Sequence, residues 1–233
     1  MTRALILIIA ICFTLKLNAQ TLLLERDLSE SVYVKKKGPN KDHFLHIYSD
    51  LSGYIPLNGD RVYEPGRSFR YYTGLRNYYR LAGNYIMGFN LEFGWENFRI
   101  DQSNAKIFPA PGTHKKETLV TSNLGLEYFN RILITQKETS LGIWIDAGAY
   151  GNLTLGSRHV AKDKAAATDQ IRYSKTVEKG LKYLNPWEFG VKGRIGYKRY
   201  AITGTYRLTD WVKGVSSNYE PSKFSIGVEL GLY

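Results

Sequence analysis

An unbroken alternation of apolar with polar or small residues over 140–155 constrains the fold of this chain more than any other sequence feature. One set of alternate positions includes Leu141 and Ile145, and the opposite set includes Asp146 and Asn152. A period of two puts successive side chains on opposite faces of a β-strand. Strands in soluble sandwiches usually contain about five or six residues. A run of this length therefore favours a strand that crosses a membrane in a β-barrel.

Seven further segments alternate in the same way, with apolar residues expected outward and polar residues inward. They are 43–51, 69–81, 85–95, 120–128, 187–197, 200–208 and 224–232. Glycine, β-branched and aromatic residues crowd these windows, and none has the three- and four-residue apolar spacing of an amphipathic helix. We therefore predict an all-β fold, a single antiparallel transmembrane β-barrel of about eight strands.

The connections between these segments alternate in length as well. Residues 82–84 and 198–199 form short connections, and 130–139 forms a somewhat longer one. The opposite set is long and comprises 53–65, 100–116, 156–184 and 209–222. Outer-membrane barrels have short periplasmic turns and longer extracellular loops. We therefore expect the long set to face the outside of a bacterial cell.

The N-terminal segment has the pattern of an export signal. Arg3 precedes an apolar run at 4–15, and Ala19 supplies a small residue before a cleavage point. The run is too short for a membrane-spanning helix, which needs about 20 residues. Cys12, the single cysteine, lies inside this run. We therefore expect no disulfide, cysteine nucleophile or thiolate metal site in the mature chain.

These observations divide the chain into three parts. We predict a signal peptide at 1–19, a periplasmic N-terminal arm at 20–42 and the barrel at 43–233. No internal repeat or linker indicates a second domain. The expected location is the bacterial outer membrane, because a chain exported without a long apolar helix can span a membrane only as a closed barrel.

The chain is strongly basic, with a formal net charge of +11. In an exported barrel, this charge favours outer-membrane lipid or glycan as a partner rather than nucleic acid. Lysine clusters occur at 35–37 and 115–116. The segment 157–182 is the best candidate for contact with another membrane or export-complex protein, because loops carry function on rigid scaffolds. The periplasmic arm is a second candidate.

The inward positions carry charges of both signs. The candidates for ion pairs in the lumen are Arg70, Arg76, Glu92, Glu127, Asp146, Glu188, Lys192, Arg194, Arg207 and Glu229. Eight strands leave an interior just wide enough for side chains to fill. An unpaired buried charge is very costly. We therefore expect a lumen closed by ion pairs, with a narrow ion path or catalytic carboxylates as the alternatives.

The four histidines give little support to a metal site or an active site. His43 and His46 are three residues apart, so a strand puts them on opposite faces. His114 and His159 fall in separate predicted outer loops. No Gly-x-Ser-x-Gly context supports a nucleophilic serine. We expect no cofactor, no metal and no catalytic residue.

Three motifs resemble the PorT-like outer-membrane β-barrel proteins of Bacteroidota, which have an OmpX-type shape. They are IDAGAYGNLTLGS at 145–157, WEFGVKGRIGYKRYAITGTYRLTD at 187–210 and KFSIGVELGLY at 223–233. The resemblance covers about 42–233. Tyr233 is aromatic, as the end of such a barrel should be, but the last apolar positions fall in the opposite register. The resemblance implies a barrel and permits a role in a protein complex.

The function that these features predict is that of a non-enzymatic outer-membrane barrel. Its role would be structural or in protein interaction, and a subunit of an export or assembly complex is one form that this role could take. A small-solute channel is the alternative, and a lipid- or surface-modifying enzyme is a further one. The enzyme would need a cluster of histidines or carboxylates at the outer rim.

Overall fold

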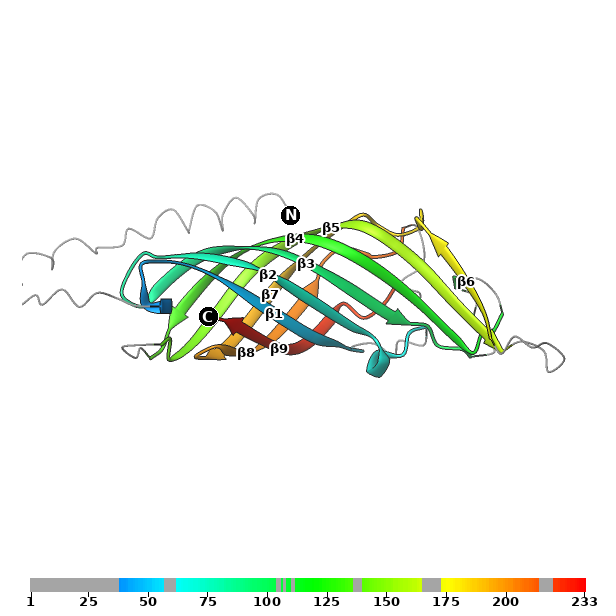
Figure 1. Ribbon diagram of the computed structural model, residues 1–233, viewed down its shortest axis with the longest axis horizontal. Helices are drawn as coiled ribbons and strands as arrows, with labels where there is room; N and C mark the ends of the chain where they lie inside the picture. The colour runs from blue at the N-terminus through cyan, green and yellow to red at the C-terminus, as the bar shows by residue number, and fades with distance from the viewer. Residues whose placement is uncertain are drawn as a thin grey trace, which may run out of the picture. The chain divides into compact units, whose positions relative to one another are not determined.

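The computed structural model describes residues 38–56, 62–103, 106, 108–109, 112–135, 140–164, 173–213 and 220–233. Residues 36–233 belong to one compact unit. The predicted signal peptide, and the predicted arm before residue 38, lie outside the described residues. The described part is all-β, with two short 3₁₀ turns at Gly38–Asn40 and Pro65–Arg67. Figure 1 shows the strands of this unit wrapped around a common axis.

Eight antiparallel strands close into a barrel, which confirms the predicted fold class. They are β1 (His43–Ile55), β2 (Phe69–Arg80), β3 (Tyr85–Arg99), β4 (Lys116–Leu133), β5 (Ile143–Lys164), β7 (Trp187–Tyr197), β8 (Tyr200–Arg207) and β9 (Phe224–Leu232). Each strand pairs with its neighbour around the wall, β5 pairs directly with β7, and β9 pairs back to β1. Each strand of the closed wall has a hydrogen-bonded neighbour on both sides. The backbone N–H and C=O groups of the wall are therefore satisfied within the barrel.

The strands follow the predicted period of two. In β7, exposed residues such as Val191 and Ile195 alternate strictly with buried residues such as Lys192 and Arg194. The lumen is therefore polar, and the outer surface of the wall is apolar. The same pattern holds in β3 and in most of β4.

The predicted long loop at 156–184 is wrong in part, because strands occupy much of it. β5 continues to Lys164, and β6 (Tyr173–Lys179) returns beside it as an antiparallel partner. Figure 1 shows β6 next to the far end of β5, beyond the closed wall. A bulge opposite Ser122 and Asn123 changes the facing of β5 after Leu155. This change disguised the continuation, because the apolar alternation stops there.

The predicted start of the fifth strand is also wrong. β5 begins at Ile143 rather than at residue 140. Leu141 is buried, with only 1% of its surface exposed, although the alternation assigned it to the outer face. The chain turns before the strand, where Thr135 Oγ1 accepts a hydrogen bond of 2.7 Å from the Ile143 amide. Leu141 therefore points into the end of the barrel.

The two ends of the barrel differ in their connections. The short-turn end has the connections 81–84, 134–142 and 198–199, and the long-loop end has 56–68, 100–115, 180–186 and 208–223. Lys198 has a left-handed backbone, with φ of 55°, in the two-residue turn between β7 and β8. Its carbonyl accepts hydrogen bonds from Trp144 Nε1 (3.2 Å) and from the Tyr233 hydroxyl (3.0 Å). These two aromatic residues hold the strained turn in place.

Each end of the lumen is covered by an apolar cluster. The turn cluster at the short-turn end contains Tyr78, Ile86, Phe129, Leu133, Leu141, Trp144 and Ala201. The loop cluster at the long-loop end contains Tyr54, Tyr63, Phe98, Ile100, Leu119, Leu181, Leu184, Trp211 and Val212. The loop cluster draws on loops as well as strands, and the ring of Trp211 lies 4.5 Å from that of Phe98. The charged interior is therefore enclosed between two apolar layers.

Candidate functional site: the charged interior of the barrel

The structure places all ten residues that the sequence assigned to the lumen in the interior of the barrel. Each exposes 6% or less of its surface. The buried cations of the strands are Arg70, Arg76, Arg131, Lys192, Arg194 and Arg207. The buried carboxylates of the closed wall are Asp50, Glu92, Glu96, Glu127, Asp146, Glu188 and Glu229. Among the described residues, these six cations and seven carboxylates nearly cancel in charge.

Arg194 is the centre of the network in the half of the lumen nearer the short turns. Its guanidinium contacts three carboxylates, which lie on three different strands. Nη2 is paired with Glu127 on β4, Nη1 lies 3.3 Å from Asp146 Oδ2 on β5, and Nε lies 2.9 Å from Glu229 Oε2 on β9. A single side chain thus ties together opposite parts of the wall.

Arg76 forms a second hub beside it. Its Nη1 and Nη2 donate to the two oxygens of Glu229 at 2.6 and 2.8 Å, a bidentate geometry. Its Nε donates to Asn90 Oδ1 at 3.0 Å, and Asn90 Nδ2 in turn donates to Glu127 Oε2 at 2.8 Å. The guanidinium also lies 4.3 Å from the centre of the Tyr48 ring. Each of the three guanidinium nitrogens of Arg76 therefore donates a hydrogen bond.

Sequence reasoning missed Arg131, which forms the other bidentate pair. Its Nε and Nη2 donate to the two oxygens of Asp146 at 2.7 and 2.8 Å, and its guanidinium stacks 3.8 Å from the centre of the Trp144 ring. The predicted strand ends at residue 128, whereas β4 continues to Leu133, so Arg131 falls in a predicted connection. Extending the same parity by three residues would have found it.

Lys192 links the network across the lumen. Its Nζ lies 3.1 Å from Glu92 Oε2 on β3 and 3.3 Å from Glu127 Oε2 on β4. The hydroxyl of Tyr48 donates to Glu92 at 2.6 Å. We call the assembly of Arg76, Arg131, Lys192 and Arg194 with Glu92, Glu127, Asp146 and Glu229 the turn-side half of the lumen.

The interior nearer the long loops is bonded differently. Arg70 Nη2 lies 3.7 Å from Glu96, whose Oε1 accepts a 2.9 Å hydrogen bond from the Tyr72 hydroxyl. Glu188 accepts from the Tyr150 hydroxyl at 2.9 Å and from Asn152 at 3.3 Å. We call the assembly of Arg70 and Arg207 with Glu96, Glu188, Tyr72, Tyr150, Asn123 and Asn152 the loop-side half. Neutral hydroxyls and amides replace bidentate ion pairs there.

The partner of Arg207 comes from a loop that the sequence did not assign to the lumen. Glu220 Oε1 accepts from Arg207 Nη2 at 2.7 Å and from the Trp211 amide at 2.6 Å, and Oε2 accepts from the Val212 amide at 3.2 Å. Burial raises the pKa of the Glu220 carboxyl, although Arg207 and the two amides act to lower it. Glu220 thereby holds Trp211 in the loop cluster.

Two inward glycines show how tightly the lumen is filled. A Cβ at Gly196 would lie 2.2 Å from the nearest ring atom of Trp144, and a Cβ at Gly190 would lie 2.6 Å from ring atoms of Tyr150. Trp144 is paired in register with Gly196 and Tyr150 with Gly190, so each ring lies against a position of β7 that has no side chain. The interior therefore gains its large aromatic residues only because glycine occupies the facing positions.

The predicted placement of the histidines is partly wrong. His46 is buried and His43 is exposed, as the parity of a strand requires. His159 lies in β5 rather than in a loop, and its Nε2 lies 2.6 Å from Glu117 Oε1. His114 Nδ1 lies 2.9 Å from Asp163, also of β5. Both histidines therefore gather at one rim, where sequence analysis had separated them.

This rim is where an enzyme of the lipid-modifying type would need its catalytic groups. Glu117 is fully buried and also contacts Lys106 and Gln102 Nε2, the latter at 2.8 Å. These contacts fasten the connection 100–115 to β4 and β5. Within the part of the chain that the structure describes, no hydroxyl side chain hydrogen-bonds to His114 or His159, and no three metal-ligating residues gather.

Comparisons with known proteins add no assignment to this geometry. No helix among the described residues is long and apolar enough to cross a membrane. The similarity to the PorT-like family stays a prediction that rests on the three motifs given above. No protein-family model matches the chain, and no curated protein matches its sequence.

Proposed function

We propose that this protein is a non-enzymatic β-barrel of the bacterial outer membrane, with a structural or protein-interaction role in a membrane assembly. The observation that carries the proposal is a wall that is apolar on the outside around an interior crossed by ion pairs. The outer surface suits lipid, and the filled interior leaves the loops and the N-terminal arm as the parts available to partners. Membership of an export or assembly complex is a form of this role that the PorT-like resemblance permits.

The arrangement of aromatic residues on the outer surface supports the membrane location. Exposed aromatic side chains form two belts. The belt near the short turns contains Tyr79, Phe89, Tyr128, Tyr197 and Tyr200, and the belt near the long loops contains Phe69, Trp95, Trp187, Phe189 and Tyr206. Exposed aliphatic residues such as Leu91, Leu126 and Ile195 lie between the belts on the same strands. Membrane barrels have an apolar band flanked by aromatic girdles at both interfaces.

The filled lumen supports an interaction role over a channel. Arg194 and Lys192 reach carboxylates on strands β3, β4, β5 and β9. Their side chains therefore cross the space that a solute would need. A chain that closes its lumen with its own ion pairs gains a rigid scaffold, on which loops can be presented to another protein.

Fractionation and extraction test the membrane location. The mature protein should sediment with outer membranes, need detergent for extraction, and migrate faster on gels unheated than boiled. Recovery as a soluble periplasmic monomer would contradict the proposal.

Chemical cross-linking in native membranes tests the interaction role. A cysteine placed at exposed Lys182 or Lys213, at the long-loop end, gives a site for a short cross-linker in a chain whose predicted mature part has no other cysteine. The same change at exposed Lys41, at the opposite end and within the predicted N-terminal arm, probes the second candidate for partner contact. Discrete adducts from either end would identify the partner, and an absence of adducts from both ends would count against a complex.

A further inference from the structure

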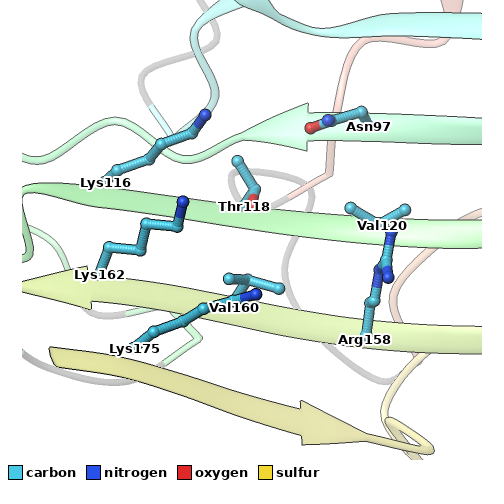
Figure 2. A pocket seen from close by; sticks show the side chains of 8 residues that line it. All are labelled: Asn97, Lys116, Thr118, Val120, Arg158, Val160, Lys162 and Lys175. Carbon is cyan, nitrogen blue, oxygen red and sulfur yellow. The ribbon is translucent and has the colours of Figure 1, made fainter.

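A row of three lysines crosses the outward face of the extension that β4, β5 and β6 form beyond the closed wall. Lys116 of β4 is paired in register with Lys162 of β5, and Lys162 is paired in register with Lys175 of β6. All three side chains are exposed. Figure 2 shows them on adjacent strands, around a shallow hollow that also involves Asn97 and Thr118.

A second row of basic residues lies four residues farther down the strands. Arg158 of β5 is paired with Lys179 of β6 and with Val120 of β4. Between the two rows, Thr118, Val160 and Val177 form a small neutral strip in the same register. The outward face thus carries five cations in two rows, which a rise of about 3.3 Å per residue puts roughly 13 Å apart along the strands.

This arrangement is unfavourable for the chain alone. Like charges directly opposite each other on neighbouring strands are destabilising. None of the outward positions on these stretches is an Asp or Glu. Within the part of the chain that the structure describes, none of the five cations makes an ion pair with a carboxylate. Since the lumen charges nearly cancel, the net charge of +11 lies outside the lumen, and this face holds a concentrated part of it.

The position of the face indicates what kind of anion it would meet. It continues the outer surface of the wall, directly beyond exposed apolar residues that include Trp95 and Leu155. Arg158 follows Leu155 by three residues and so lies within about 10 Å of it along the strand. A lipid whose chains packed against this part of the wall would therefore have its head group at the height of the basic rows.

We propose that this face, defined by Lys116, Arg158, Lys162, Lys175 and Lys179, binds the phosphate-bearing head group of a glycolipid in the surrounding leaflet. The proposal rests on the membrane location proposed above. Two separated rows of cations suit a head group with more than one anionic group, and the threonine and valine strip between them suits the sugar that joins those groups. Binding would remove the repulsion within the lysine row, so the lipid stabilises the extension that it contacts.

The test uses the full-length mature protein folded in a neutral detergent, with bis-phosphorylated lipid A as the probe. The readout is the midpoint temperature at which the fast-migrating folded band is lost on gels. The test variant is Lys116→Gln/Lys162→Gln/Lys175→Gln, and the matched control, with the same change in charge at exposed positions elsewhere, is Lys41→Gln/Lys182→Gln/Lys213→Gln. Parallel titrations use the same lipid without its phosphates, and inorganic phosphate.

We expect lipid A to raise the midpoint of the wild type and of the control equally, with an effect that weakens at high salt because exposed charges are screened. The test variant should need at least tenfold more lipid A for the same shift, given about a fivefold contribution per lysine near an anionic surface. Without lipid, its midpoint should equal or exceed that of the wild type, because the repulsive row is gone.

Three results would overturn the inference: an undiminished response of the test variant, an equal shift with the phosphate-free lipid, or a full shift with inorganic phosphate alone. Failure of the proposed function is a separate outcome. In that case, neither the wild type nor the variants would insert into phosphatidylcholine vesicles, whatever their response to lipid A.

Discussion

The two halves of the lumen solve the problem of buried charge in different ways. In the turn-side half, Arg76 and Arg131 each form a bidentate pair with one carboxylate, and Arg194 contacts three. In the loop-side half, the distance between Arg70 and Glu96 is 3.7 Å, and hydroxyls supply most of the hydrogen bonds. The turn-side half is therefore a rigid network, whereas the loop-side half is a looser one.

The difference extends to polar atoms that the protein itself leaves unmatched. Among the described residues, several buried atoms in the loop-side half have no hydrogen-bond partner within the chain. They are Arg70 Nη2, Glu96 Oε2, Asn123 Oδ1, Asn152 Oδ1 and Arg207 Nε. The turn-side half has two such atoms, Glu92 Oε1 and Arg194 Nε, and Arg194 Nε still lies 2.9 Å from Glu229 Oε2. Buried polar groups are costly unless they are satisfied, and ordered water commonly satisfies them. The comparison teaches that the turn-side half is held mainly by its own ion pairs, whereas the loop-side half has more buried polar atoms without a partner from the chain.

Removal of one central charge should have the largest effect. Arg194→Met should lower the free energy of unfolding by about 3–5 kcal/mol, because three buried carboxylates would lose a shared cation. Arg70→Met, the matched change in the loop-side half, should cost only about 1–3 kcal/mol. Urea unfolding of the folded barrel in phosphatidylcholine vesicles measures both. Equal costs would show that the two halves are equally rigid.

Filling the space beneath an aromatic ring should have the next largest effect. Gly196→Ala should destabilise the barrel by about 1–3 kcal/mol, because the new Cβ would overlap the Trp144 ring. Gly193→Ala on the same strand is the control, since its Cβ would meet nothing closer than 3.9 Å. The same urea titration applies. A neutral Gly196→Ala would mean that the Trp144 ring moves easily, against a rigid turn-side half.

Relief of the strained turn should give a smaller change of opposite sign. Lys198→Gly should stabilise the barrel by up to about 1 kcal/mol, because a left-handed backbone suits glycine better than lysine. The hydrogen bonds that Trp144 and Tyr233 donate to this turn use the backbone carbonyl and are kept. Lys41→Gly, outside the strands, is the control for loss of a lysine. Destabilisation by Lys198→Gly would show that the lysine side chain itself contributes to the turn.

The smallest expected effect is on ion conductance. The wild type should conduct negligibly in planar bilayers, because side chains of the turn-side half cross the lumen. Trp211→Ala should admit water to the loop-side half by removing part of the loop cluster. It should still not conduct, since the turn-side network is unchanged. A steady conductance in Trp211→Ala would place the seal in the loop cluster instead.

The sequence was sufficient to predict the eight strands of the wall, because each strand has one face toward a polar interior and one toward an apolar exterior. The same signal fails where a strand leaves that environment. Beyond Leu155, the outward residues include charged ones such as Arg158 and Lys162, and a bulge changes their parity, so the extension of β5 and the whole of β6 were missed. The alternation also assigned Leu141 wrongly to the outer face. An apolar residue can point into the end of a barrel as well as toward its exterior.

The lumen residues were predictable as a set but not as pairs. Parity assigns Glu229 and Arg76 to the interior, yet only the closed barrel shows that they meet across 153 positions of sequence. Arg131 has the same parity as Glu127 on β4, but it lies beyond the end of the predicted strand. Glu220 could not be predicted from alternation, because it reaches Arg207 from a loop with no regular period.

Closure of the wall has a consequence for the order in which this protein can assemble. β1 begins at His43, but its second neighbour, β9, ends at Leu232, so the seam between them joins almost the two ends of the described chain. Until the last strand arrives, both seam strands have an open edge that could pair with another chain. Bringing such distant segments together is entropically slow. The pair between Arg76 and Glu229 spans β1 and fastens the seam from within, so it can form only at the final step of assembly and then resists reopening.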